Sequence, residues 1–198
     1  MDIERIICDI EKAMKAEGFM SALALTLTLP DVCAQIEYPS IYHKEEEYEG
    51  HKGQGAAYSK WYDEYIAKYE IDPESEGRVM TGRECWRLRC GLFHDVKIDM
   101  DNLMSSEKEE VRFEFIASTD SNNEYLMGGA SMISTQSGQD GKMYHCIQLD
   151  IVNFCKKIIE VFRHTYLKND EIKAKLDQNK VSFSYIDYPK RNRTNSAE

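Results

Sequence analysis

The chain of 198 residues predicts a mainly α-helical fold (α+β by strict count), in which a bundle of about five helices carries a small antiparallel β-sheet. Two observations predict it. Apolar residues recur at helical spacing in several stretches, and three stretches after residue 109 alternate apolar and polar residues as strands do. We expect a single domain at 1–188, with helices within 2–95, a β insertion at about 110–149 and further helices at about 150–178, followed by a flexible tail at 189–198.

The first helix is predicted at residues 2–17. Its apolar residues fall at the i, i+3, i+4 and i+7 positions of one helical stripe, and Gly18 is a natural stop. These residues are Ile3, Ile6, Ile7, Ile10, Ala13 and Met14.

The next stretch, "SALALTLTLPDVCAQIEYP", has two interpretations. Four leucines between residues 23 and 29 alternate along it, which is typical of a strand, whereas its alanines and leucines favour a helix. We predict a helix with a kink or break near Pro30, since proline removes one backbone hydrogen bond. A segment that is apolar on all sides fits the centre of a bundle.

The middle of the chain combines a loop, an aromatic stripe and a helix start. Residues 42–55 are charged and glycine-rich, which predicts a solvated loop. Thr81 and Glu84 match a capping box, so we expect a helix from about Gly82 to about Asp95. An aromatic stripe at helical spacing lies between them; we interpret it as core, although a platform for stacking bases has the same pattern. The stripe consists of Tyr58, Trp61, Tyr62, Tyr65 and Tyr69.

The last third of the chain predicts the sheet and the closing helices. The strand-like stretches are residues 110–118, 124–134 and 142–150, with a final one at 181–188. Asp150 is placed to cap a long helix that begins at Ile151, and a short helix is expected at residues 170–178.

Composition and cysteine usage limit the classes of function. Hydrophobic residues make up 42% and charged residues 30%, as in folded proteins. A net charge of −10 disfavours a dedicated nucleic-acid binder, yet it leaves room for a local positive cleft. The N-terminus lacks the pattern of a signal peptide, so we expect a cytoplasmic protein with no membrane association. The six cysteines include no Cys-x-x-Cys, which predicts reduced, buried thiols and neither a metal nor another cofactor.

The helix at residues 82–95 places its arginines on different faces. At about 100° per residue, Arg89 falls inside the apolar arc, whereas Arg83, Arg87 and His94 form one row on the opposite side. An arginine in an apolar arc is costly without a partner, so Arg89 should meet a buried acid or carbonyls, or line a cleft. The apolar arc consists of Cys85, Trp86, Leu88, Leu92, Phe93 and Val96.

The segment Arg89-Cys-Gly-Leu-Phe-His94 resembles the motif of the HEPN superfamily, an arginine and a histidine separated by four to six residues on a helix. Arg87 and His94 also satisfy that spacing. The resemblance implies a small helical bundle, often a homodimer, and a metal-independent ribonuclease activity. In it, His94 would act as general acid or base toward a ribose 2′-hydroxyl, and Arg89 or Arg87 would stabilise charge on the phosphate.

Two functional classes therefore remain open. The first, which we rank higher, is a non-catalytic accessory or interaction domain in which Arg89 is a structural ion-pair partner and His94 ends a helix. The alternative is a HEPN-like metal-independent ribonuclease or RNA-binding module using Arg89 (or Arg87) and His94, for which RNA and a second copy of the chain are the expected partners. The spatial relation between the arginines and the histidine discriminates the two classes.

Overall fold

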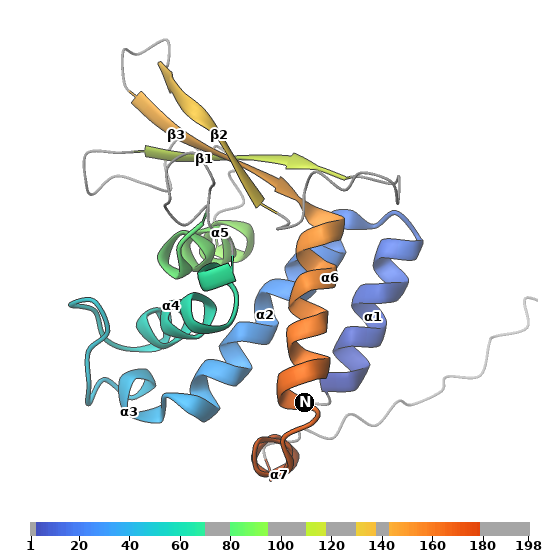
Figure 1. Cartoon of the computed structure of the whole chain (residues 1–198), viewed down its shortest axis with the longest axis vertical. Helices are drawn as coiled ribbons and strands as arrows, with labels where there is room; N and C mark the ends of the chain where they lie inside the picture. The colour runs from blue at the N-terminus through green and yellow to red at the C-terminus, as the bar shows by residue number, and fades with distance from the viewer. Residues whose placement is uncertain (1–2, 70–79, 95–109, 118–129, 138–142, 179–198) are drawn as a thin grey trace, which may run out of the picture.

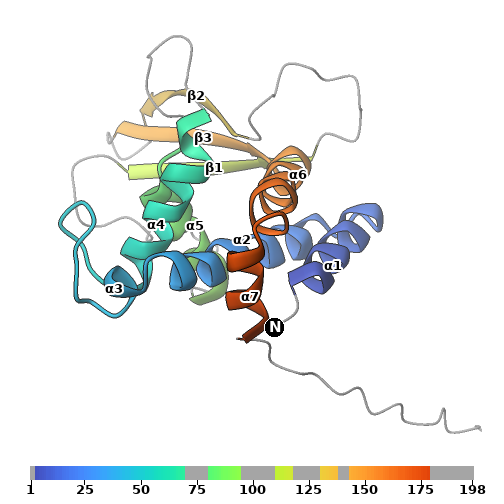
Figure 2. The ribbon, with the colours of Figure 1, turned by 60° about the horizontal axis from the view of Figure 1, so that its bottom comes forward.

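The computed structural model describes residues 3–69, 80–94, 110–117, 130–137 and 143–178. In them a helical body carries a three-stranded sheet at one end, as Figure 1 shows and as the rotated view in Figure 2 makes clear. The helices are α1 (Ile3–Lys15), α2 (Phe19–Glu37), α3 (Pro39–Tyr42), α4 (Gln54–Tyr65), α5 (Gly82–His94), α6 (Ile151–Val161) and α7 (Asp170–Gln178). The strands are β1 (Glu110–Ile116), β2 (Ala130–Ser137) and β3 (Met143–Asp150). The predicted mainly helical fold, with a small sheet following α5 in the chain, is confirmed, but the described residues form seven α-helices where about five were predicted.

Helix α1 buries the predicted stripe, because Ile3, Ile6, Ile7 and Ile10 all belong to the core. Its end differs from the expectation at Gly18. The left-handed residue is Glu17, with φ of 58°, and the amides of Glu17 and Gly18 donate to the carbonyls of Met14 and Ala13. This is a Schellman turn whose left-handed position, usually glycine, is occupied by a glutamate.

Helix α2 is the central element of the body, and it runs unbroken through Pro30. The predicted break at Pro30 is therefore wrong, and so is the alternative strand interpretation. The helix contacts α1, α4 and α6, and the apolar area that these contacts bury outweighs the one hydrogen bond that proline removes. Its fully buried side chains include Leu23, Leu27 and Leu29.

By length and composition alone, α2 could also cross a membrane, with a mean hydropathy of 1.4 over its most apolar window. A buried core helix and a signal sequence meet the same criterion. In this fold the packing against α1, α4 and α6 accounts for the apolar composition of α2. The cytoplasmic location stays a prediction.

The sheet has the strand order β1-β3-β2. Strands β2 and β3 pair antiparallel, but β1 pairs with β3 in parallel, with Phe113 opposite Ile147, so the prediction of an antiparallel sheet is wrong at this pair. Alternating polarity predicts strands but not their direction, since side chains alternate in either kind of pair. The sheet joins the body through Ile147 and Leu149, which are fully buried, and through the partly buried Phe113 and Phe115.

The C-terminal part begins with the predicted cap. The Asp150 carboxylate accepts hydrogen bonds from the amides of Val152 (3.0 Å) and Asn153 (3.2 Å), which starts α6. A π-helical turn, Phe162–Tyr166, follows α6, and the predicted short helix at residues 170–178 is confirmed as α7. The predicted strand at 181–188 and the tail lie outside the described residues.

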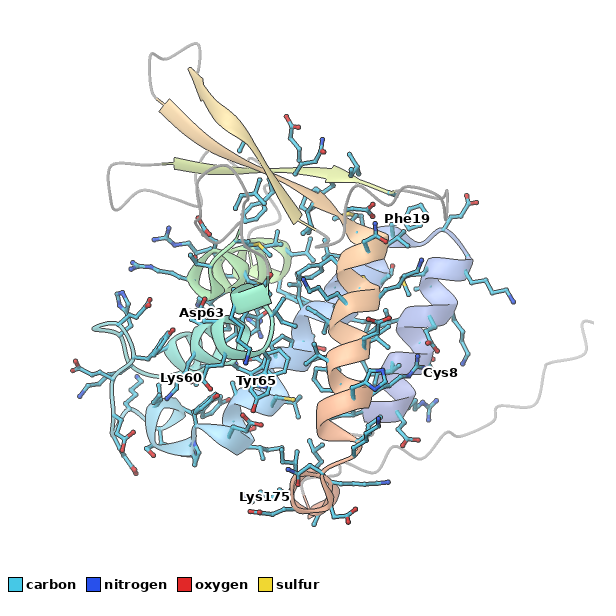
Figure 3. All side chains as sticks on the ribbon, viewed as in Figure 1. Cys8, Phe19, Lys60, Asp63, Tyr65 and Lys175 are labelled. Carbon is cyan, nitrogen blue, oxygen red and sulfur yellow. The ribbon has the colours of Figure 1, made fainter. Side chains whose placement is uncertain are left out.

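The aromatic stripe on α4 is core, as expected. Tyr58, Trp61 and Tyr62 are fully buried, and the Tyr58 hydroxyl donates to the Leu27 carbonyl at 3.3 Å. The interpretation as a platform for bases is therefore wrong for these three residues. Figure 3 shows the contrast with the periphery, where exposed side chains such as Cys8 and Lys175 lie.

Candidate functional site

Helix α5 starts with the predicted capping box. The Thr81 amide donates to Glu84 Oε2 at 2.7 Å, and the Glu84 amide donates back to Thr81 Oγ1 at 3.2 Å. Two backbone donors at the helix start are thereby satisfied reciprocally. The capping box therefore fixes the residue at which α5 begins, and with it the face of the helix on which each arginine lies.

A buried carboxylate then ties α5 to α4. Asp63 of α4 is 3% exposed, and it accepts from the Gly82 amide (2.9 Å) and from the Tyr48 hydroxyl (3.0 Å). The two helices approach so closely that a Cβ on Gly82 would lie 2.0 Å from the Ser59 carbonyl oxygen. Only glycine fits at this position, so α5 packs directly against α4. The Asp63 carboxylate in turn connects the start of α5 to the loop that carries Tyr48.

Arg89 has an acidic partner, as its position predicts, although this partner is partly and not fully buried. Its Nη2 donates to Asp31 Oδ2 at 2.9 Å, and the two side chains are 17% and 14% exposed. The other Asp31 oxygen accepts from the Gln54 side chain at 2.9 Å. The guanidinium carbon of Arg89 also lies 4.9 Å from the Trp86 ring centroid and 5.3 Å from that of Phe93. Charge and aromatic contacts therefore hold Arg89 inside the fold.

His94 is the last residue of α5. Its side chain lies outside the described part of the structure, so the pairing of His94 with Arg89 or Arg87 stays a prediction. The helix itself places Arg87 and His94 two turns apart along one row, as the spacing requires.

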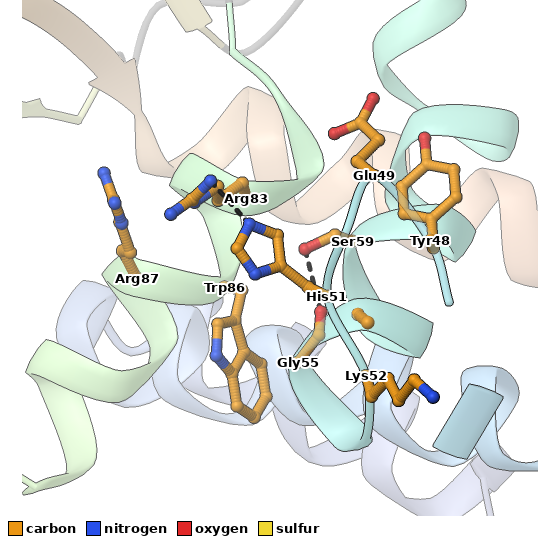
Figure 4. A pocket seen from close by; sticks show the side chains of 10 residues that line it. Tyr48, Glu49, His51, Lys52, Gly55, Ser59, Arg83, Trp86 and Arg87 are labelled. Atoms are coloured by element: carbon orange, nitrogen blue, oxygen red, sulfur yellow. Dashed lines mark hydrogen bonds between the residues drawn. The ribbon is translucent and has the colours of Figure 1, made fainter. Parts of the chain in front are cut away.

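The outer face of α5 borders a pocket of about 360 Å³, which we call the α4–α5 pocket. Figure 4 shows Arg83 and Arg87 projecting from α5 toward the same side, with the His51 ring next to Arg83. The helical period of about 100° per residue predicted Arg83 and Arg87 on one face of α5, and both line this pocket. The described residues that line the pocket are Tyr48, Glu49, His51, Lys52, Gly55, Ala56, Ser59, Arg83, Trp86 and Arg87.

His51 reaches the pocket because of a tight turn in the loop at 43–53. Tyr48 and His51 exchange two backbone hydrogen bonds, of 2.9 and 3.0 Å, around Glu49 and Gly50, which both have positive φ. This is the geometry of a type I′ turn. Sequence reasoning missed His51, because the loop was predicted only as solvated; the Glu-Gly pair followed by a histidine was the available signal.

Charge in the α4–α5 pocket is mainly positive. Among the residues that the structure describes, Arg83, Arg87 and Lys52 line it together with the carboxylate of Glu49, and the Lys52 amine lies 3.4 Å from Glu47 Oε1. Arg83 Nη1 lies 2.7 Å from His51 Nε2. Because a guanidinium can only donate, His51 Nε2 accepts in this arrangement. The chain of net charge −10 thus contains the local positive cleft that its composition allows.

All six cysteines are free thiols, as predicted, and four of them are buried: Cys33, Cys85, Cys146 and Cys155. Burial raises the pKa of Cys155 to about 11, although the hydrogen bond from Thr26 (3.1 Å) opposes the shift. A thiol with a raised pKa is a poor nucleophile, so Cys155 is structural. Cys8 is exposed and Cys90 is intermediate, so the expectation of buried thiols is wrong for these two.

The fold and the site together define a mainly helical domain with an internal arginine–aspartate pair and a separate, positively charged pocket. Within the described residues, no group of three or more His, Cys, Asp or Glu side chains is placed to hold a metal ion. The chain matches no protein-family model, no curated protein and no solved structure.

Proposed function

We propose that the protein is a non-catalytic accessory or interaction domain. The observation that carries this proposal is the ion pair between Arg89 and Asp31. Arg89 is the arginine of the HEPN-like motif, and its charge is already opposed by a carboxylate at 2.9 Å.

The physical reason is the cost of redirecting Arg89. An arginine that stabilises a phosphoryl transition state must direct its donors at the substrate. To do so here, Arg89 would have to leave Asp31, which would then be a largely buried carboxylate without its charge partner. It would also give up the ring contacts with Trp86 and Phe93. The energetics of this residue favour a structural role.

An assay of RNA cleavage tests the proposal. Structured RNA is incubated in EDTA with the wild type, with His94→Ala and with the control Arg163→Gln, which changes an exposed arginine that pairs with Glu11 of α1. We expect equal RNA integrity in all three reactions. Cleavage by the wild type and Arg163→Gln that His94→Ala abolishes would contradict the proposal.

The second candidate is a HEPN-like metal-independent ribonuclease that uses Arg87 and His94. The observation that favours it is the position of Arg87, which lines the α4–α5 pocket and precedes His94 by two turns of α5. In this assignment Arg89 takes no part in the reaction and remains paired with Asp31. It predicts that Arg87→Gln abolishes cleavage as completely as His94→Ala, and that the active species is a homodimer by light scattering. Loss of cleavage in Arg89→Lys with full activity in Arg87→Gln would contradict it.

A further inference from the structure

We propose that the α4–α5 pocket binds a small molecule that carries a phosphomonoester group. This inference goes beyond the proposed function, because ligand binding in this pocket and the absence of catalysis are measured independently. It depends on three features of the pocket: a pair of arginines on one helix row, an adjacent histidine that can change its hydrogen-bonding role, and a volume suited to a small molecule.

The arginine pair supplies the charge. Arg83 and Arg87 are four residues apart on α5, so they emerge one turn apart on the same face, and Figure 4 shows both extending toward the same side. Two guanidinium forks together present donors in several directions, which suits the three terminal oxygens of a phosphomonoester better than the two oxygens of a carboxylate. Two adjacent positive charges also match a dianion.

His51 completes the anion site. It now accepts from Arg83 at 2.7 Å, and this contact holds the guanidinium at the pocket. When a phosphate oxygen takes the Arg83 donor, His51 Nε2 is released, and in the tautomer that carries hydrogen on Nε2 the ring donates to the same phosphate. Among the described lining residues the carboxylate is Glu49, which lies on the loop and not on α5.

The remaining lining sets the size and polarity of the rest of the ligand. The pocket volume of about 360 Å³ lies near the lower end for small-molecule sites. Trp86 and Ala56 give it apolar walls, and a Cβ on Gly55 would lie 2.6 Å from Trp86 Nε1, so the absence of a side chain at Gly55 lets the indole lie where it does. The ligand therefore combines a phosphate with a compact apolar or aromatic group.

The charge of the whole molecule favours a small ligand over a nucleic-acid strand. A net charge of −10 disfavours a strand with many phosphates, because the affinity of such a strand depends on many contacts with cationic side chains. A single phosphomonoester meets only the local potential of Arg83 and Arg87. RNA is accordingly an alternative occupant that the experiment must distinguish.

The test is calorimetric titration of the intact chain with phenyl phosphate, inorganic phosphate and a short oligouridylate without terminal phosphates. We expect phenyl phosphate to bind at millimolar concentration or below, more tightly than inorganic phosphate, and the oligonucleotide not to bind. Arg83→Gln and Arg87→Gln should each weaken binding of phenyl phosphate about tenfold, the equivalent of one charge-assisted hydrogen bond. The matched control Arg163→Gln should leave the affinity unchanged.

Variants that retain the charge guard against effects on folding. Arg83→Lys and Arg87→Lys should keep the wild-type circular dichroism and bind phenyl phosphate with intermediate affinity, because a lysine provides the charge without the fork. The proposal is overturned if the folded wild type does not bind phenyl phosphate at millimolar concentrations, or if Arg163→Gln weakens binding as much as Arg87→Gln. It is equally overturned if the oligonucleotide binds more tightly than phenyl phosphate.

Discussion

The two faces of α5 carry the same type of residue in opposite settings. On the inner face, Arg89 is 17% exposed, paired with Asp31 and in contact with two aromatic rings. On the outer face, Arg83 and Arg87 line the α4–α5 pocket, where Arg83 contacts a loop histidine. The face of the helix, and not the presence of an arginine, determines which guanidinium is structural and which can bind a ligand. The inner side should therefore be sensitive to substitution and the outer side tolerant.

The largest effect is expected where α5 approaches α4 most closely. In Gly82→Ala the new methyl group would meet the Ser59 carbonyl oxygen at 2.0 Å, so the helices must separate, and we expect a loss of about 3 to 5 kcal/mol in the free energy of unfolding. The control Gly18→Ala places its Cβ at an ordinary 3.4 Å from the Ala13 carbonyl oxygen and should cost less than about 1 kcal/mol. Urea denaturation measures both. Equal losses would contradict the close contact at Gly82.

The next effect compares the two faces directly. Asp31→Ala leaves the Arg89 charge inside the fold without its carboxylate, and should cost about 2 to 4 kcal/mol of stability. Arg87→Ala, at a partly exposed position on the outer face, should cost less, about 1 kcal/mol. Urea denaturation of the two variants gives the comparison. If Arg87→Ala proves the more destabilising, the assignment of the two faces is reversed.

Cys155 extends the comparison to a buried thiol and to pH. Its pKa is raised mainly by burial from an ordinary 9.0 to about 11, so the unfolded chain loses this proton first as the pH rises. The stability contributed by the buried neutral thiol is present below pH 9 and lost between pH 9 and 11, by about 2 kcal/mol. The destabilisation caused by Cys155→Ala, measured in reducing buffer, should shrink by that amount across this window. A constant difference between wild type and variant would show that the thiol titrates normally.

The smallest effect is expected at the start of α5. Thr81→Ala removes the hydroxyl that accepts from the Glu84 amide, and should cost about 1 kcal/mol. Thr28→Ala is a matched control, since the Thr28 hydroxyl donates to the Leu25 carbonyl within a helix and caps nothing. Thermal unfolding of both variants should show a lower midpoint for Thr81→Ala alone. A similar midpoint for the two would mean that the cap adds little to the setting of α5.

Local chemistry made α5 predictable from the sequence. The capping box depends on two residues three positions apart, and the division of the α5 arginines between two faces depends on the helical period. Both features can therefore be predicted from residues that are close in the sequence. The same holds for Asp150 at the start of α6. The need of Arg89 for an acid was also predictable, because it follows from the cost of desolvating a charge.

The features that sequence reasoning missed depend on residues far apart in the chain. Asp31, the partner of Arg89, lies 58 positions away, and many carboxylates of the chain satisfied the same requirement. His51 enters the pocket only because its loop folds back on α5. The parallel pairing of β1 with β3 likewise depends on the path of the chain between the strands, and alternating polarity does not predict that path.

The apolar composition of α2 has a consequence for biosynthesis. Part of its cover is α6, which begins only at Ile151, so most of the chain must leave the ribosome before that cover exists. Until then the nascent chain exposes an apolar segment that has the length and composition of a membrane-spanning helix. Folding of α2 into the core therefore depends on a part of the chain that is synthesised more than a hundred residues after it.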